Sequence, residues 1–156
     1  TDTRTIDNDK SGGILVNKFK EANHNLIERK ICKDNKDDIV VILKEWLRNE
    51  KIDVIITTGG TGLTGRDITP EALNEVAEKH IPGFGEIFRN ISIKTVGTSA
   101  IQSRACAVLS NGKYIFALPG SSGGVTDAWE GILKHQLDIN HKPCNFVELF
   151  PRLKEK

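Results

Sequence analysis

The 156-residue sequence contains no methionine and only three cysteines, Cys32, Cys106 and Cys144. The cysteines are an odd, scattered set without a C-x-x-C pair, which is typical of a reducing compartment and offers no zinc site. We expect them to be buried or half-buried thiols. The four histidines do not form H-E-x-x-H or another ligand spacing, so we assign none of them to catalysis.

Long apolar runs and an excess of one charge are also missing. No run approaches the roughly 18 residues that a membrane-spanning helix needs, and no signal peptide precedes the fold, which predicts a cytoplasmic protein without a membrane partner. Lysine and arginine number 22 against 21 acids, a net charge of +1, which argues against the positive field of a nucleic-acid binder. We therefore expect small molecules and other copies of the chain as partners.

The most informative segment that is present leads from a strand through a glycine-rich turn into a helix. Residues 54–56 are β-branched and apolar, which favours a buried strand, and Thr69-Pro70-Glu71 places an N-cap hydroxyl before a proline. Between them, Gly59, Gly60 and Gly62 lack Cβ atoms, so the backbone can take positive φ and present its N–H groups to a phosphate. The segment therefore predicts an anion-binding loop.

Two charged residues near the end of this loop extend the prediction. Arg66 could pair with phosphate oxygens, and Asp67 offers a hard oxygen ligand for Mg²⁺. Glycines that merely turn the chain explain the same spacing equally well. The loop also lacks the Lys-Ser/Thr ending of a P-loop and the G-x-G-x-x-G spacing of a dinucleotide fold.

Hydrophobic periodicity predicts an alternation of helices and strands along one domain of residues 1–156. Asn111-Gly112 predicts a two-residue hairpin, so one strand must run antiparallel. The alternation favours an α/β fold, a three-layer α/β/α sandwich with a mostly parallel sheet and one antiparallel edge strand. The expected helices cover residues 12–23, 35–49, 70–80, 85–91 and 121–137, the expected strands cover residues 26–32, 54–56, 105–109 and 114–118, and residues 140–156 form a packed tail.

The order and the gaps of several short motifs are similar to those of the MoaB/MogA family of molybdenum-cofactor biosynthesis proteins, relatives of the gephyrin G domain. These motifs are the string from Thr57 to Ala72, Pro82-Gly83-Phe84-Gly85-Glu86, Ser103-Arg104-Ala105 and Leu118-Pro119-Gly120-Ser121. The resemblance covers nearly the whole chain. Pro143-Cys144-Asn145-Phe146 looks more like MoaB than MogA.

The resemblance implies a molybdopterin-binding domain that assembles as a trimer or a hexamer, with residues around Ile91 and Val96 at subunit contacts. The family has a first apolar strand before the position where this sequence opens at Thr1, so we expect the natural start to be missing. The implied activity is adenylylation of molybdopterin by Mg-ATP, with Mg²⁺ as cofactor. The alternatives are a protein that binds molybdopterin and assembles without catalysis, and a generic nucleotide-binding domain.

Two carboxylates match functional positions of the family, Asp67 in the glycine loop and Asp34 after the expected strand 26–32. Strand ends meet at one edge of an open α/β sheet, so both carboxylates could face one site and bind a metal. The alternative reading is a pair of turn or cap carboxylates, which is strong for Asp34 because Asp-Asn before a helix is ordinary capping chemistry.

Further residues are implied in phosphate or substrate binding. Pro119-Gly120-Ser121 ends a strand and opens a helix, which favours a second anion site, although an ordinary N-cap serine fits as well. Glu86 either caps its helix or binds substrate. One departure from the family is Gly123, where MogA and several MoaB-like chains carry a lysine. The full implied set is Gly59, Gly60, Thr61, Gly62, Arg66, Ser11, Gly12, Glu86, Pro119, Gly120 and Ser121.

Overall fold

The computed structural model describes residues 4–155. Their strands form a mixed four-stranded sheet in the order β1-β4-β3-β2. The parallel pair is β1 (Val54–Thr58) with β4 (Lys113–Leu118), whereas β3 (Cys106–Ser110) runs antiparallel to both β4 and β2 (Lys79–His80). The expected antiparallel strand therefore exists, but it lies inside the sheet rather than at its edge, because β2 pairs with its outer side.

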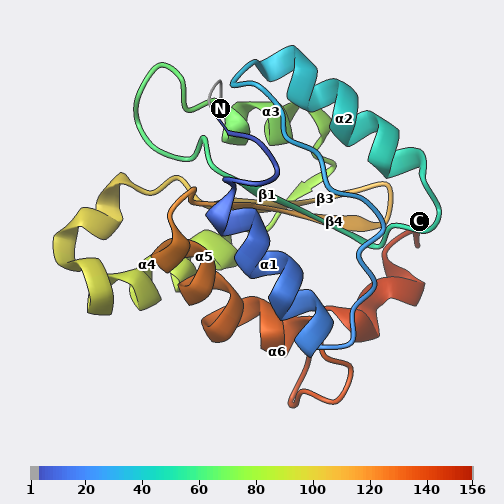
Figure 1. The fold of residues 1–156 in the computed structure, drawn as a ribbon. Helices are drawn as coiled ribbons and strands as arrows, with labels where there is room; N and C mark the ends of the chain where they lie inside the picture. The colour runs from blue at the N-terminus through green and yellow to red at the C-terminus, as the bar shows by residue number, and fades with distance from the viewer. Residues whose placement is uncertain (1–3, 156) are drawn as a thin grey trace.

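Helices cover both faces of this sheet, which confirms the three-layer α/β architecture (Figure 1). On one face lie α2 (Lys36–Arg48) and α3 (Thr69–Val76), and the other face carries α1, α4, α5 and α6. The bounds of these four helices are Lys10–Glu21 for α1, Pro82–Val96 for α4, Ser122–Ala128 for α5 and Lys134–Gln136 for α6. A π-helical turn at Trp129–Leu133 joins α5 to α6, and 3₁₀ helices lie at Gly97–Gln102 and Val147–Arg152. None of the described helices is both long and apolar enough to cross a membrane.

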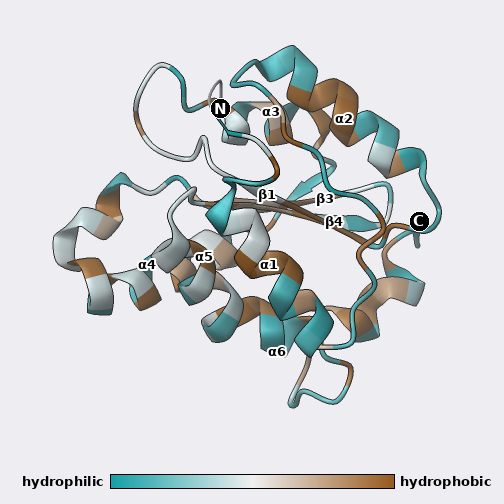
Figure 2. Cartoon of the chain, in the orientation of Figure 1, coloured by the Kyte–Doolittle hydropathy of each residue, from teal (hydrophilic) through white to brown (hydrophobic). Residues whose placement is uncertain are grey.

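Each face of the sheet packs its own apolar cluster. Phe88, Phe116 and Trp129 belong to the larger cluster beneath α1, α4 and α5, while Leu43 and Leu73 belong to the one beneath α2 and α3. Figure 2 shows hydrophobic residues concentrated along the middle of the sheet. The continuous apolar run of β4, buried at every position, is what a central strand covered on both faces requires.

The hairpin between β3 and β4 confirms the turn prediction from Asn111-Gly112. Both residues have positive φ, 47° and 70°. This is the backbone that a two-residue turn needs to match the twist of its strands.

Two expected elements differ from the structure. Residues 26–32, predicted as a strand, run extended but join no strand ladder. The helix predicted over residues 70–80 ends at Val76, because Lys79 and His80 pair with Leu109 and Val108 of β3. In both cases the absence or presence of a distant pairing strand, and not the local pattern, decides the structure.

Two of the three thiols are half-buried, as expected. Burial raises the pKa of Cys32 and of Cys106, whereas Cys144 is exposed, contrary to expectation.

The two residues that marked the expected subunit contact differ in exposure. Val96 is exposed at the end of α4, but Ile91 packs against the larger apolar cluster. Of the two residues that marked the expected subunit contact, only Val96 is therefore largely exposed.

Candidate functional site

The glycine loop leaves the carboxyl end of β1 with the predicted backbone conformation. Gly59 has φ 104° and Gly60 has φ 67°. A Cβ atom on Gly60 would lie 2.4 Å from the Thr69 hydroxyl oxygen, so a side chain is excluded there by both space and φ. Thr69 was expected as the N-cap, yet it is the first helical residue, and its hydroxyl donates to the Gly59 carbonyl at 2.9 Å.

The second loop leaves the neighbouring strand β4 and touches the first. Thr58 donates its hydroxyl to the Pro119 carbonyl at 2.9 Å, and a Cβ atom on Gly120 would lie 3.2 Å from the Gly59 Cα atom. Ser121 is the N-cap of α5 and accepts from the Gly124 N–H at 3.1 Å. The two loops therefore form one backbone surface at the carboxyl ends of the parallel pair β1 and β4.

An N-terminal cluster joins this surface from a third side. Arg4 donates to the Gly120 carbonyl at 3.1 Å and to the Ser11 hydroxyl at 3.0 Å. Asp9 caps α1 by accepting from the Gly12 N–H at 3.0 Å, and Arg29 binds its other oxygen at 2.9 Å. Ser11 is 1% exposed, so the structure places this predicted phosphate ligand in the interior, where it donates to Asp9.

The Asp9 carboxylate should make folding sensitive to acid. Burial raises its pKa, but the hydrogen bonds from Gly12, Arg29 and Ser11 outweigh burial and leave the pKa below its ordinary value. Its contribution to stability is therefore complete above the unfolded pKa of about 4 and disappears as the pH falls through the lower folded pKa. In urea melts, we expect Asp9→Asn to lose roughly 1–2 kcal/mol at pH 7 and less near pH 3. An equal loss at both values would contradict this role.

The Asp67 side chain closes a turn within the glycine loop. Its Oδ2 accepts from the Thr64 N–H at 2.9 Å and from the Thr64 hydroxyl at 2.7 Å. These bonds, the hydroxyl first, hold the pKa of Asp67 below its ordinary value despite partial burial. Asp67 is therefore ionised at neutral pH and has a structural role in the loop.

The structure brings the other predicted charges to the same place. Arg66 forms an ion pair with Asp34 at 3.6 Å, which joins the glycine loop to the segment that follows residues 26–32. Both residues line one cavity with Asp67, although the segment before Asp34 is not the strand on which the prediction relied. Among the described residues, no group of three or more Asp, Glu, His and Cys side chains is arranged to hold a metal. Two carboxylates fit a Mg²⁺ ion that arrives with phosphate ligands, rather than a closed protein cage.

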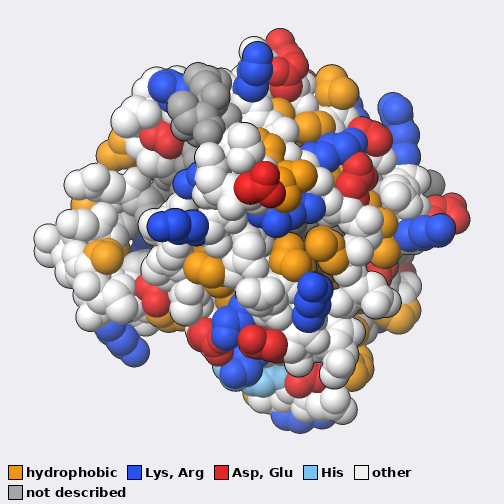
Figure 3. Space-filling view, in the orientation of Figure 1, with side chains coloured by type: hydrophobic (Ala, Val, Ile, Leu, Met, Phe, Trp, Pro, Cys, Tyr) orange, Lys and Arg blue, Asp and Glu red, His pale blue; other side chains and the backbone are white. Residues whose placement is uncertain are grey.

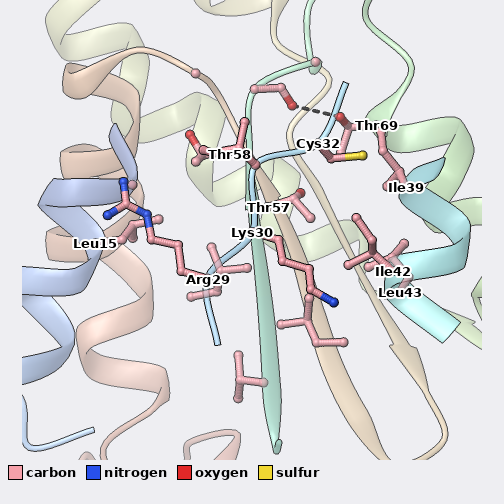
Figure 4. Close-up of a pocket in the computed structure, with 18 of the residues that line it drawn as sticks. Leu15, Arg29, Lys30, Cys32, Ile39, Ile42, Leu43, Thr57, Thr58 and Thr69 are labelled. Atoms are coloured by element: carbon pink, nitrogen blue, oxygen red, sulfur yellow. Dashed lines mark hydrogen bonds between the residues drawn. The ribbon is translucent and has the colours of Figure 1, made fainter. Parts of the chain in front are cut away.

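The cavity has a volume of about 940 Å³. Its lining includes the two loops, with Gly60 and Gly120, and continues along residues 26–32, β1 and α2. Figure 4 shows Ile39, Ile42 and Leu43 of α2 along this cavity, together with Arg29 and Lys30. Charged side chains of both signs are intermixed on the face seen in Figure 3, in line with the net charge of +1.

Glu86 is the predicted site residue that the structure does not bring to the loops. It is exposed on α4 and lines a separate cavity of about 240 Å³ with His80 and Arg89. Motif spacing gave no role to Arg4 and Arg104, which contact the loops, or to Glu71, which pairs with Arg104. Arg4 and Arg104 contact loop carbonyls more than 35 positions away, and such contacts leave no local sequence signal.

Comparison with known proteins agrees with this geometry. Residues 3–139 match the family described as "Probable molybdopterin binding domain". Molybdenum cofactor biosynthesis protein B of Escherichia coli (strain K12) is 41% identical over 152 residues, which cover 97% of this chain and 88% of that protein. The chain belongs to the MoaB/MogA family.

Solved structures of this family share the fold. A crystal structure of Molybdenum cofactor biosynthesis protein B matches with a TM-score of 0.89 and 38% identity, covering 100% of this chain and 92% of the other. The tungsten cofactor synthesizing protein MoaB from Pyrococcus furiosus matches with a TM-score of 0.76 and 34% identity, covering 83% and 81%. These matches confirm the predicted family and its α/β fold.

Proposed function

We propose that this protein acts in molybdenum cofactor biosynthesis as a molybdopterin adenylyltransferase. In this reaction the terminal phosphate oxygen of molybdopterin attacks the α-phosphorus of ATP, the new P–O bond forms, and the bond to pyrophosphate breaks. The observation that carries the proposal is the joined backbone surface of the Gly59 and Gly120 loops, with Asp67, Arg66 and Asp34 lining the same cavity. Phosphoryl chemistry depends mostly on such positioning and on electrostatics.

The proposed roles follow from the chemistry of each group. Backbone N–H groups of residues 59–62 and of Gly120 and Ser121 bind phosphate oxygens. Arg66 neutralises charge on the transferred group, and its pairing with Asp34 keeps it near the cavity until substrate arrives. Asp67 and Asp34 would hold Mg²⁺, which neutralises the charge that develops on the phosphates. Asp67 can bind the ion while it accepts from Thr64, because a carboxylate has about four lone-pair sites.

The second candidate is a protein that binds molybdopterin and assembles without adenylylating it. The feature that favours it is Gly123, which lies in the first turn of α5 with open space around it. The resemblance to the family implies a lysine at this position in MogA and several MoaB-like chains. A missing cation close to bound phosphates weakens their binding. Four exposed apolar side chains on α4 and the 3₁₀ helix after it support a homo-oligomer under either candidate, and these are Ile87, Ile93, Val96 and Ile101.

One assay separates the two candidates. The protein is incubated with molybdopterin and Mg-ATP, and adenylyl-molybdopterin and pyrophosphate are measured over time. Formation of both products at equal rates supports the adenylyltransferase. Binding of molybdopterin without either product would replace it with the assembly role.

Restoring a lysine at position 123 should strengthen phosphate binding. A Cβ atom there would meet no atom within 4 Å, so Gly123→Lys should fold normally. A solvated cation near a phosphate contributes under 1 kcal/mol, which corresponds to a roughly threefold lower Kd for Mg-ATP in calorimetry. Gly123→Ala is the matched control, because it makes the same backbone change without the charge. Equal affinities of the two variants would contradict the expectation.

A further inference from the structure

Arg104 contacts the glycine loop through both its backbone and its side chain, and no role has been given to it so far. It lies between the 3₁₀ helix and β3, and its backbone N–H donates to the Thr61 carbonyl at 2.8 Å. Its guanidinium donates to the Gly62 carbonyl at 2.7 Å and to the Asp67 carbonyl at 2.5 Å. One residue therefore holds both ends of the loop segment 61–67.

Glu71 fixes the direction of the Arg104 guanidinium. Its carboxylate, in the first turn of α3, accepts from Nη1 and from Nη2 of Arg104. The Arg104 guanidinium is the main reason that the pKa of Glu71 lies below its ordinary value. The planar fork of arginine suits this arrangement, since it can serve a carboxylate and two carbonyls at once, which a lysine ammonium cannot do in the same geometry.

The middle of the loop has little else to hold it. Leu63, Thr64, Gly65 and Arg66 are all exposed, so few packing contacts restrain them. Loops of this kind open locally at low cost. The Thr64 and Asp67 bonds close the turn internally, and the exposed ion pair of Arg66 with Asp34 at 3.6 Å attaches it only weakly to the segment after residues 26–32.

We propose that Arg104 is the positioning residue of this site, and that it fixes segment 61–67 in the conformation that presents Arg66 and Asp67 to the cavity. Its effect on the loop is independent of the reaction, whereas its effect on turnover rests on the proposed adenylyltransferase function. The two parts can therefore be tested separately.

Trypsin reports directly on the loop, because Arg66 is the one cleavage site within residues 61–67. Cleavage needs the loop to leave its folded conformation. We expect Arg104→Met to speed cleavage after Arg66 about tenfold under native conditions, and Arg104→Lys to fall between it and the original protein. Arg89→Met is the matched control, since Arg89 also donates to two carbonyls, those of Ser103 and Ala105, but does not touch the loop.

Unchanged cleavage after Arg66 in Arg104→Met, or equal acceleration in Arg89→Met, would overturn the proposal. If Arg104→Met does not fold, Glu71→Gln supplies the same test, with a smaller acceleration expected. In the adenylylation assay, Arg104→Met should lower kcat more than it raises KM, by about 100-fold for a misplaced reacting group. An inactive original protein removes the adenylyltransferase function and leaves the trypsin result to decide the role of Arg104.

Discussion

Replacing Asp67 with asparagine should lower the rate of molybdopterin adenylylation by about 100- to 1000-fold, or roughly 3–4 kcal/mol. The substitution removes one negative charge from the place where the proposed Mg²⁺ and the phosphates meet. The effect should fall mainly on kcat, because a preorganised charge acts most strongly where charge develops in the transition state.

The same variant should fold, because an asparagine oxygen can accept the two bonds that Thr64 donates to Asp67. A loss of about 1 kcal/mol is expected from the weaker, uncharged acceptor. The matched control is Thr64→Val, which removes the hydroxyl bond but leaves the backbone N–H bond and the carboxylate. If Thr64→Val and Asp67→Asn lose equal activity, the loop conformation and not the charge carries the effect. An Asp67→Asn variant with full turnover would remove this carboxylate from the mechanism.

A large loss of stability from a single methyl group is expected at Gly60. An alanine there must hold φ near 67°, and its Cβ atom would lie 2.4 Å from the Thr69 hydroxyl oxygen. The strained φ and the lost bond from Thr69 to the Gly59 carbonyl together cost roughly 2–4 kcal/mol. Because the helix α3 begins at Thr69, the start of this helix should shift as well.

Gly65→Ala is the internal control for Gly60→Ala. Gly65 belongs to the same loop, its φ lies outside the left-handed region, and an added Cβ atom would meet nothing within 4 Å. Urea unfolding should place Gly65→Ala within about 0.5 kcal/mol of the original protein. Similar stabilities for the two variants would show that the loop relaxes around Gly60.

Local patterns predicted the parts of the fold that local physics decides. The Asn111-Gly112 turn needs positive φ at two adjacent positions, and few other residues supply it. The glycines of the loop between β1 and α3 are explained in the same way. The apolar run of β4 predicted a buried strand, and this prediction did not depend on knowing which strands pair with it.

Elements that depend on distant partners were predicted less well. Residues 26–32 have strand-like composition, but a strand also needs a neighbouring strand to receive its hydrogen bonds. Lys79 was predicted to lie in a helix, but it pairs as a strand residue with Leu109, 30 positions later in the sequence. The structure likewise separates Glu86 from the loops and brings in Arg104, and neither outcome can be read from motif spacing.

The close approach of Gly59 and Gly120 also has an evolutionary consequence. These positions are distant in sequence, yet a side chain at position 120 would press on the backbone at position 59 and part the two loops. Gly59 is held by its φ of 104° and Gly120 by this contact, so each position favours glycine for its own reason while both loops bind one ligand. Across descendants of this chain both positions should stay glycine as long as phosphate binds here, and a lineage that stops binding phosphate is released from both constraints in a single step.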